Sequence, residues 1–581
     1  MVRSNIPTEA TVQNVQNLSQ GGIGQQNIPQ GGTNMFNAGE FVITGEHATV
    51  NFDSHESYLR GLFTLGQIDP VSDKRSIERR KGGLLRQSYQ WILSNADFKR
   101  WRQDPDVGLL WIRGDPGKGK TMLLCGVIDE LSRQKSQGEQ NLAFFFCLDE
   151  RRDDAVGVVR GLLASLFVQQ PDIRRSYETR FRGQPPLNVT SWEVLREVME
   201  GVFRDPRLRE TCIIIDALDE CRHGLWDLLA LISRMPSPRI KFLLASRSSD
   251  RIQQALKVGT AVGNRLLSLE LNSEAISEAV YSYIEHRLAG YEGYDAALKQ
   301  EARQYLQKNS GSTFLWVALV IQELATDRTP RWKLGSLLDR LRAFPSSLEE
   351  LYKRIWSNML ITHENEDVDV DTRRSLCPRI LALVLTVERP VSLTEASLLI
   401  DWPADFPIND LARQEAIGYC RSFVTIGVDD KVIHMVHQSA KDFLLKHAVG
   451  MLFPSGAAFH HLNIAQVSLM VISKTLHEGM RPPANRKDRR RSASAPSQQK
   501  SVDAATYSCL YWVDHLQLGL VAQPKKVQHQ YLKDGGPVHV FLQTHLLHWF
   551  EFIALHGAVS TGITALSTLI TLSTAILPVD T

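Results

Sequence analysis

Four short apolar runs, at 109–112, 143–147, 212–215 and 242–245, organise the region between residues 109 and 250. Continuous apolar runs of this length are typical of strands that are buried on both faces. The longer segments between them carry apolar residues at helical spacing, so strands alternate with helices. We therefore predict an α/β domain over 108–258, built as a parallel sheet with helices on both faces.

The chain before this domain divides into two parts. Residues 1–53 are rich in Gly, Asn, Gln and Thr, have almost no Leu, and are predicted to be disordered. Within them, 34–45 and 48–52 are β-prone pieces of low charge, a composition that suits cross-β stacking. Two interpretations stay open: a flexible leader with a chance strand, and an amyloid-prone, self-templating signalling segment. Residues 54–107 are predicted to form a helical lead-in.

The chain after this domain is mainly helical. We predict a helical domain over 259–345 and a winged-helix domain over 346–447, where strands 423–428 and 431–436 flank an Asp-Asp turn and Ser439 caps the next helix. A C-terminal helical region follows over 448–581. Its basic, Ser/Pro-rich insertion at 481–501 is predicted to be a disordered solvated linker, or alternatively a phosphorylation or nuclear-import site.

Composition narrows the classes of partner. The 581 residues carry a net charge of +2, which provides no general attraction for nucleic acid, and the acidic wing turn at 429–430 also disfavours it. Seven cysteines without metal-ligand spacing and an N-terminus without a signal peptide predict a cytoplasmic protein. Residues 554–578 lack charged side chains, so a membrane anchor is an alternative, but their many Ser and Thr residues favour a packed helix.

Residues 114–121 carry the first chemical motif, a complete G-x-x-x-x-G-K-T phosphate loop between a predicted strand and a predicted helix. Backbone N–H groups of such a loop surround a phosphate at the helix N-terminus. Lys120 is expected to reach the β- and γ-phosphates, and Thr121 to bind Mg²⁺. The predicted nucleotide-binding residues of this segment are Gly114, Asp115, Pro116, Gly117, Lys118, Gly119, Lys120, Thr121 and Met122.

The second motif follows the third apolar run and reads Asp216-Ala217-Leu218-Asp219-Glu220. A carboxylate at the carboxyl end of a parallel strand lies at the edge of the sheet where ligands bind. We predict that Asp216 holds Mg²⁺, and that Asp219 or Glu220 orients or deprotonates the attacking water. Together the two motifs predict an Mg²⁺-dependent P-loop NTPase core.

The Asp-Ala-Leu-Asp-Glu segment and the phosphate loop with its preceding strand resemble those of fungal NACHT proteins. These are members of the STAND class of signal-transduction NTPases and include heterokaryon-incompatibility receptors. The resemblance extends from about Asp69 to Phe552. It implies that Arg247 senses the γ-phosphate and that Gly311-Ser312-Thr313-Phe314-Leu315 lies near the base, with Phe314 where many relatives have proline. It also implies that His437 contacts the β-phosphate of bound ADP; the alternative is a capping or core histidine.

The resemblance implies a switch that is closed with ADP or GDP and opens and oligomerises with ATP or GTP. Hydrolysis would be slow, and output would come from clustering of residues 34–52 or from an effector bound there, in self/non-self recognition or regulated cell death. The alternatives are a turnover enzyme such as a nucleotide kinase, a transcription regulator, and a nucleotide-locked scaffold without turnover. Relatives usually continue into WD40 or ankyrin repeats, whereas this chain stops at Thr581. A truncated form, a short paralogue and a partner of a separate sensor are all compatible with that difference.

Overall fold

The computed structural model describes strands at 33–35, 41–44 and 47–50, residues 59 and 62, and most of 69–576. Within 69–576, the segments outside the described residues are 135–139, 148–153, 182–186, 222, 235–237, 257–262, 291–295, 327–338, 340, 361–369, 404–405, 408, 428–430, 477–502 and 557. The predicted Asp-Asp turn and the basic insertion therefore lie outside the described residues.

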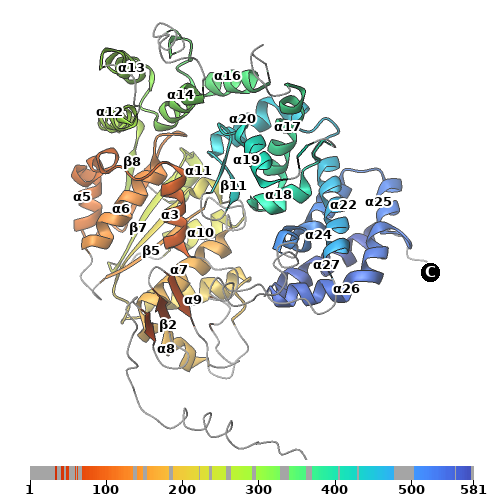
Figure 1. The fold of residues 1–581 in the computed structure, drawn as a ribbon. Coiled ribbons are helices and arrows are strands. Elements are labelled where there is room, and N and C mark those ends of the chain that lie inside the picture. The colour runs from red at the N-terminus through yellow and green to blue at the C-terminus, as the bar shows by residue number, and fades with distance from the viewer. Residues whose placement is uncertain are drawn as a thin grey trace, which may run out of the picture.

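A five-stranded sheet forms the centre of the N-terminal half (Figure 1). Its strands are β4 (Leu109–Arg113), β5 (Gln140–Phe146), β6 (Glu210–Asp216), β7 (Ile240–Ser246) and β8 (Asn264–Ser268). All are parallel, in the order β5-β6-β7-β4-β8. The predicted parallel sheet is confirmed, and β8 is an additional edge strand whose mixed polar and apolar residues gave no buried-strand signal.

Alternate residues of β4 pack into two separate cores, which shows that helices cover both faces of the sheet. Leu110 and Ile112 face one core and Leu109 and Trp111 the other. The first core includes α6 (Lys120–Gln134), and the second includes α7 (Ala155–Gln169), α8 (Pro171–Arg180), α9 (Trp192–Arg204), α10 (Leu225–Ser233) and α11 (Asp250–Ala255). The predicted arrangement of helices is therefore confirmed.

The lead-in helices belong to the same core as α6. They are α3 (Pro70–Arg80), α4 (Trp91–Ser94) and α5 (Ala96–Gln103), with a short 3₁₀ turn at Arg86–Ser88. Tyr89 is buried against Gly126 of α6. A Cβ atom at Gly126 would lie 2.3 Å from the tyrosine ring, so only glycine permits this contact.

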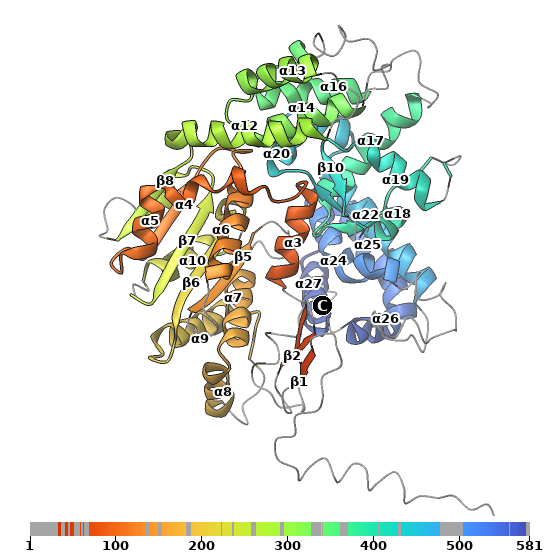
Figure 2. The same cartoon turned by 60° about the vertical axis from the view of Figure 1, so that its left-hand side comes forward.

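Helices α12 (Ser273–Ala289), α13 (Ala296–Asn309) and α14 (Phe314–Thr326) lie beyond the carboxyl ends of the strands (Figure 2). Then follow α16 (Leu348–Leu360), α17 (Val370–Thr386), β9 (Val391–Ser392), α18 (Leu393–Leu399), α19 (Asp410–Gly418), β10 (Val424–Ile426), β11 (Val432–Met435) and α20 (Gln438–His447). The strands form an antiparallel sheet in the order β10-β11-β9. We call residues 370–447 the hairpin unit; its predicted β-hairpin is present.

The C-terminal helices form their own core beside the hairpin unit (Figure 2). They are α22 (Ala457–Thr475), α24 (Thr506–Val521), α25 (Lys525–Leu532), α26 (Pro537–Leu555) and α27 (Val559–Ile576). The short α21 (Val449–Leu452) precedes them and buries Leu452 in the first core instead. In α27, Ala565 and Leu569 are buried in this core, as predicted for a packed helix. None of the helices among the described residues combines the length and hydropathy that a membrane crossing requires.

The small N-terminal sheet consists of β1 (Thr33–Met35), β2 (Phe41–Thr44) and β3 (His47–Val50). The strands pair antiparallel in the order β1-β2-β3, with Met35 opposite Val42 and Phe41 opposite Val50. The β-prone pieces therefore pair within the chain, and stacking between chains stays a prediction.

Candidate functional site

A cavity of about 920 Å³ lies where the nucleotide-binding sheet, the lead-in, the helical domain and the hairpin unit meet. The phosphate loop, Asp216, Glu220, Arg247 and His437 all line it. Since ligands of open parallel sheets bind outside the carboxyl ends of the strands, the cavity is in the expected place. Almost all sequence-predicted site residues are thus brought to one cavity, although they come from segments more than 300 residues apart.

The phosphate loop connects β4 to α6. Gly117 and Gly119 have φ values of 79° and 87°, so the loop needs residues without side chains at both positions. The Lys120 ammonium group donates to the carbonyl oxygens of Gly114, at 2.5 Å, and Asp115, at 3.1 Å. Lys120 is therefore held across the mouth of the loop, at the N-terminus of α6, where a phosphate would be bound.

The loop is attached to the helical domain through the segment from Gly311 to Leu315, which was predicted to lie near the base. Lys118 donates to the Gly311 carbonyl at 2.6 Å, and the Leu315 N–H donates to the Gly117 carbonyl at 3.3 Å. The Phe314 ring lies against Gly119 and makes an edge contact with Tyr283, 5.7 Å between centroids. Both rings line the cavity, and they provide an aromatic wall beside the phosphate loop.

Asp216 is the most deeply buried acid of the site, with 1% of its surface exposed. Neither carboxylate oxygen has a partner in normal hydrogen-bond geometry among the described residues. Burial raises the pKa of Asp216, and the Thr121 hydroxyl and the Lys120 charge oppose that shift. A buried, unpaired carboxylate beside a hydroxyl matches the oxygen ligands that Mg²⁺ prefers. Asp216 and Thr121 therefore fit an Mg²⁺ ion.

The two acids after Asp216 have different surroundings. Ala217 adopts a left-handed conformation, φ 55°, which turns the chain into a 3₁₀ turn at Leu218–Glu220. Burial raises the pKa of Glu220 to about 8, and the charges of Asp219 and Asp216 add to the shift. Asp219 instead binds Arg247. A carboxyl group with a pKa near neutrality suits a general base, so Glu220 fits that role better than Asp219.

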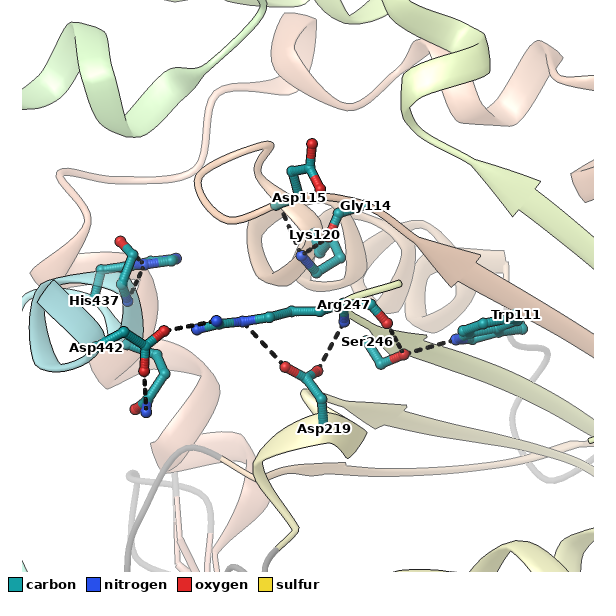
Figure 3. Close-up of polar contacts among 11 residues, drawn as sticks. Trp111, Gly114, Asp115, Lys120, Asp219, Ser246, Arg247, His437 and Asp442 are labelled. Atoms are coloured by element: carbon teal, nitrogen blue, oxygen red, sulfur yellow. Dashed lines mark hydrogen bonds and ion pairs between the residues drawn. The ribbon is translucent and has the colours of Figure 1, made fainter. Parts of the chain in front are cut away.

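Arg247 connects the sheet to the hairpin unit (Figure 3). Its N–H donates to Asp219 Oδ1 at 2.9 Å, and its Nε lies 3.2 Å from Asp219 Oδ2. Its Nη1 donates to Asp442 Oδ2 of α20 at 2.6 Å. Ser246 fixes the strand end, because its hydroxyl accepts from Trp111 Nε1 at 2.9 Å and donates to the Arg247 carbonyl at 2.8 Å.

His437 precedes α20 and caps that helix. Its Nδ1 accepts a hydrogen bond from the Ser439 N–H at 3.1 Å. The prediction that Ser439 is the cap is wrong, because the helix already begins at Gln438 and Ser439 is its second residue, whose N–H donates to the imidazole. Burial lowers the pKa of His437 well below its usual value, and the positive charges of Lys81, Lys120 and Arg247 lower it further. The neutral ring accepts at Nδ1 and therefore carries its proton on Nε2, as a donor.

Two residues of the site were missed by sequence reasoning. Lys81, at the C-terminal end of α3, lines the cavity with Asp216 and Glu220. Burial lowers its pKa, and those two carboxylates oppose the shift. Asp442 lies in a helix whose pattern gives no sign of an interdomain ion pair. Lys81 is followed by two glycines, a pattern typical of a solvated helix end, so its sequence context gave no sign of a role in the site.

Comparison with known proteins agrees with the motifs. A family model described as Nephrocystin 3, N-terminal, matches residues 87–247. The Vegetative incompatibility protein HET-E-1 of Podospora anserina is 40% identical over 535 residues, which cover 87% of this chain and 37% of that protein. The chain thus spans little more than a third of the length of this relative.

Solved structures give weaker similarities. The Aeropyrum pernix ORC2 protein, in its ADPNP-ADP complexes, is 11% identical, with coverage of 69% of this chain and 99% of that one and a TM-score of 0.26. The Aeropyrum pernix ORC1 protein in complex with DNA is 14% identical, with coverage of 68% and 98% and a TM-score of 0.27. Similarities at these TM-scores do not establish a shared fold.

Proposed function

This chain belongs to the NACHT family of fungal incompatibility proteins, and we propose that it is a nucleotide-dependent signalling switch. It would bind ATP or GTP with Mg²⁺, hydrolyse it slowly, and oligomerise in the triphosphate state. The observation that carries the proposal is the buried, unpaired Asp216 carboxylate, which lies with Thr121 and Lys120 in a cavity that several structural units share.

The phosphate-binding roles follow from the contacts. Lys120 would exchange its loop carbonyls for the β- and γ-phosphate oxygens. Asp216 and Thr121 would hold Mg²⁺, which when bound neutralises phosphate charge. Glu220 would accept a proton from the attacking water once its own proton has been lost. Burial and the neighbouring carboxylates raise the pKa of Glu220 and so oppose its ionisation, which supports slow turnover.

The switch would involve contacts with the hairpin unit. The Nε2–H of His437 would donate to the β-phosphate of a diphosphate and hold the unit closed. A nearly all-or-none switch requires about 5.5 kcal/mol of differential binding. One hydrogen bond to a charged group contributes about 1.5–3 kcal/mol, so His437 must act together with interdomain packing. Residues 346–447 contain α16 and then the helix–strand–helix–helix–strand–strand–helix order of the hairpin unit, which supports our proposal that they form a winged-helix domain.

We propose the output and location from the family relationship. The open form would oligomerise in the cytoplasm and cluster the segment that contains β1–β3, which pairs as a sheet and would act as a template or bind an effector. Regulated cell death in self/non-self recognition is the proposed process. HET-E-1 is described as a vegetative incompatibility protein, which supports this proposal.

The test is to identify the nucleotide that co-purifies with the protein and to measure its size with and without a γ-phosphate analogue. We expect a bound diphosphate, and a larger species when the analogue replaces it. Lys120→Ala should bind neither nucleotide and stay at the smaller size. Full nucleotide occupancy in Lys120→Ala, or one size in every nucleotide state, would contradict the proposal.

A nucleotide-locked scaffold without turnover is the second candidate, and the ion pair that holds Arg247 to Asp442 of the hairpin unit is the observation that favours it. Glu220→Gln distinguishes the two. A switch that hydrolyses its nucleotide should lose at least tenfold in turnover with this change and keep its affinity. A scaffold should show the same background rate in both proteins.

A further inference from the structure

Asp442 makes an ion pair between the hairpin unit and the nucleotide-binding sheet at the cavity wall (Figure 3). Its Oδ2 lies 2.6 Å from Arg247 Nη1, and its Oδ1 accepts from Gln438 Nε2 at 3.2 Å. Asp442 and Arg247 both line the same cavity as Lys120 and Asp216. The carboxylate is therefore aimed at the residue that is expected to detect the terminal phosphate.

The rest of the Arg247 guanidinium shows that it is not fully satisfied. Nε is paired with Asp219, and Nη1 is paired with Asp442. Nη2 is buried and has no hydrogen-bond partner among the described residues. A guanidinium group presents five donors in a planar fork that suits phosphate oxygens. One edge of the fork is thus occupied by protein carboxylates, while one donor of a residue that lines the cavity is left unused.

Asp219 and Asp442 both bind Arg247, but they belong to different structural units. Asp219 is bound to both the backbone and the side chain of Arg247 and lies in the same domain, so it moves with the arginine. Asp442 comes from another unit, and 44% of its side chain is exposed. Loss of the Asp442 contact would leave Arg247 in place and remove a tether between the two units.

We propose that Asp442 sets the preference of the site for a nucleoside diphosphate over a triphosphate, because it and the terminal phosphate compete for Arg247. This inference rests on the proposed function and adds a specificity-determining residue to it. A terminal phosphate brings negative charge that Arg247 could neutralise only if one of its present carboxylate partners gave way. Asp442 occupies the cation that would otherwise neutralise that charge. A bound triphosphate therefore displaces Asp442, and the hairpin unit loses its tether.

The experiment uses the full chain with Asp442→Asn, which keeps the size and polarity of the side chain and removes its charge. Dissociation constants for ADP and a non-hydrolysable ATP analogue, and for the matching guanine pair, are measured with Mg²⁺. We expect the diphosphate-to-triphosphate preference to shift about fivefold toward the triphosphate, as for the loss of one partly exposed ion pair. Asp410→Asn is the matched control, because Asp410 is exposed and, among the described residues, forms an ion pair with Arg413 one turn along its own helix.

A second pair of variants tests whether the effect passes through Arg247. In an Arg247→Gln background, Asp442→Asn should no longer change the preference. Asp442→Glu in the parent keeps the charge and should retain most of the preference. An equal change in both dissociation constants, or the same fivefold shift without Arg247, would overturn the inference.

The failure of this inference is distinguishable from that of the proposed function. If the parent binds both nucleotides and Lys120→Ala binds neither, but Asp442→Asn leaves the preference unchanged, only the role of Asp442 is wrong. If Lys120→Ala binds as the parent does, the proposed function itself is wrong.

Discussion

Two buried polar clusters, one in the nucleotide-binding cavity and one among the C-terminal helices, differ in whether their buried polar atoms have hydrogen-bond partners. Asp216 is 1% exposed, and both of its oxygens lack partners among the described residues. His515 is 0% exposed, and both of its ring nitrogens are bonded, to His461 at 2.8 Å and to Tyr507 at 2.7 Å. The Tyr507 hydroxyl in turn accepts from the Glu388 N–H at 2.8 Å, which joins α24 to the hairpin unit.

The difference indicates what each cluster is for. Leaving a buried polar group unpaired costs about 1–3 kcal/mol, or more for a charge, so it is tolerated where a ligand supplies the missing partner. A buried group whose partners are all within the chain holds elements together instead. Burial alone therefore does not identify a binding site, whereas burial without a partner beside a cavity does.

The largest effect is expected from Asp216→Asn. Affinity for the Mg²⁺–nucleotide should fall about hundredfold, since an amide is a weak ligand for Mg²⁺. The free energy of unfolding at pH 7 should change little, because the variant removes the cost of burying the carboxylate together with its attraction to Lys120 and Lys81. Isothermal titration and urea unfolding measure the two quantities, with Asp172→Asn, an exposed acid of α8, as control. A loss of stability without a loss of affinity would make Asp216 structural.

An intermediate effect is expected at His515, where acid should weaken the C-terminal core. Burial lowers the pKa of His515 to about 3, so the folded state stays neutral while the unfolded state binds a proton below about pH 6.5. Stability is therefore complete above that pH and falls as the pH drops toward 3, by about 2 kcal/mol at pH 5 from this group. His460, with a pKa of about 4, adds in the same direction.

Urea unfolding at pH 7 and pH 5, followed by the fluorescence of the buried Trp512 and Trp549, measures this loss. His515→Gln should be less stable at pH 7, show a smaller loss on acidification, and keep its nucleotide affinity. An unchanged pH dependence in this variant would contradict the assignment.

The smallest effect is expected from Lys81→Met. Lys81 is half-buried and lies among acids that a bound Mg²⁺ would partly neutralise. Removal of its charge should therefore lower the affinity for the triphosphate by only about fivefold. Lys99→Met, an exposed lysine of α5, is the matched control. If both variants bind the triphosphate as tightly as the parent does, Lys81 has a structural role and is not part of the binding site.

Sequence reasoning was most successful where one segment carries the whole signal. The phosphate loop fixes its own geometry through Gly117 and Gly119, and the apolar strand before Asp216 fixes the end of the sheet. The relationship to HET-E-1 confirms the family that these motifs indicated. Residues that act through tertiary contacts were not predictable. Asp442 becomes important only because α20 folds back to Arg247, and the cap of α20 was assigned to the wrong residue.

The contact between Tyr89 and Gly126 has a practical consequence for dissecting the protein. A fragment that begins at β4 would lack Tyr89, whose ring packs against Gly126 of α6. The same cut would remove Ile92, Phe98 and Trp101, which pack in the same core. The apolar residues of α6 that they cover would then be exposed to water. Anyone preparing the nucleotide-binding part in isolation should begin upstream of Asp69, which caps α3.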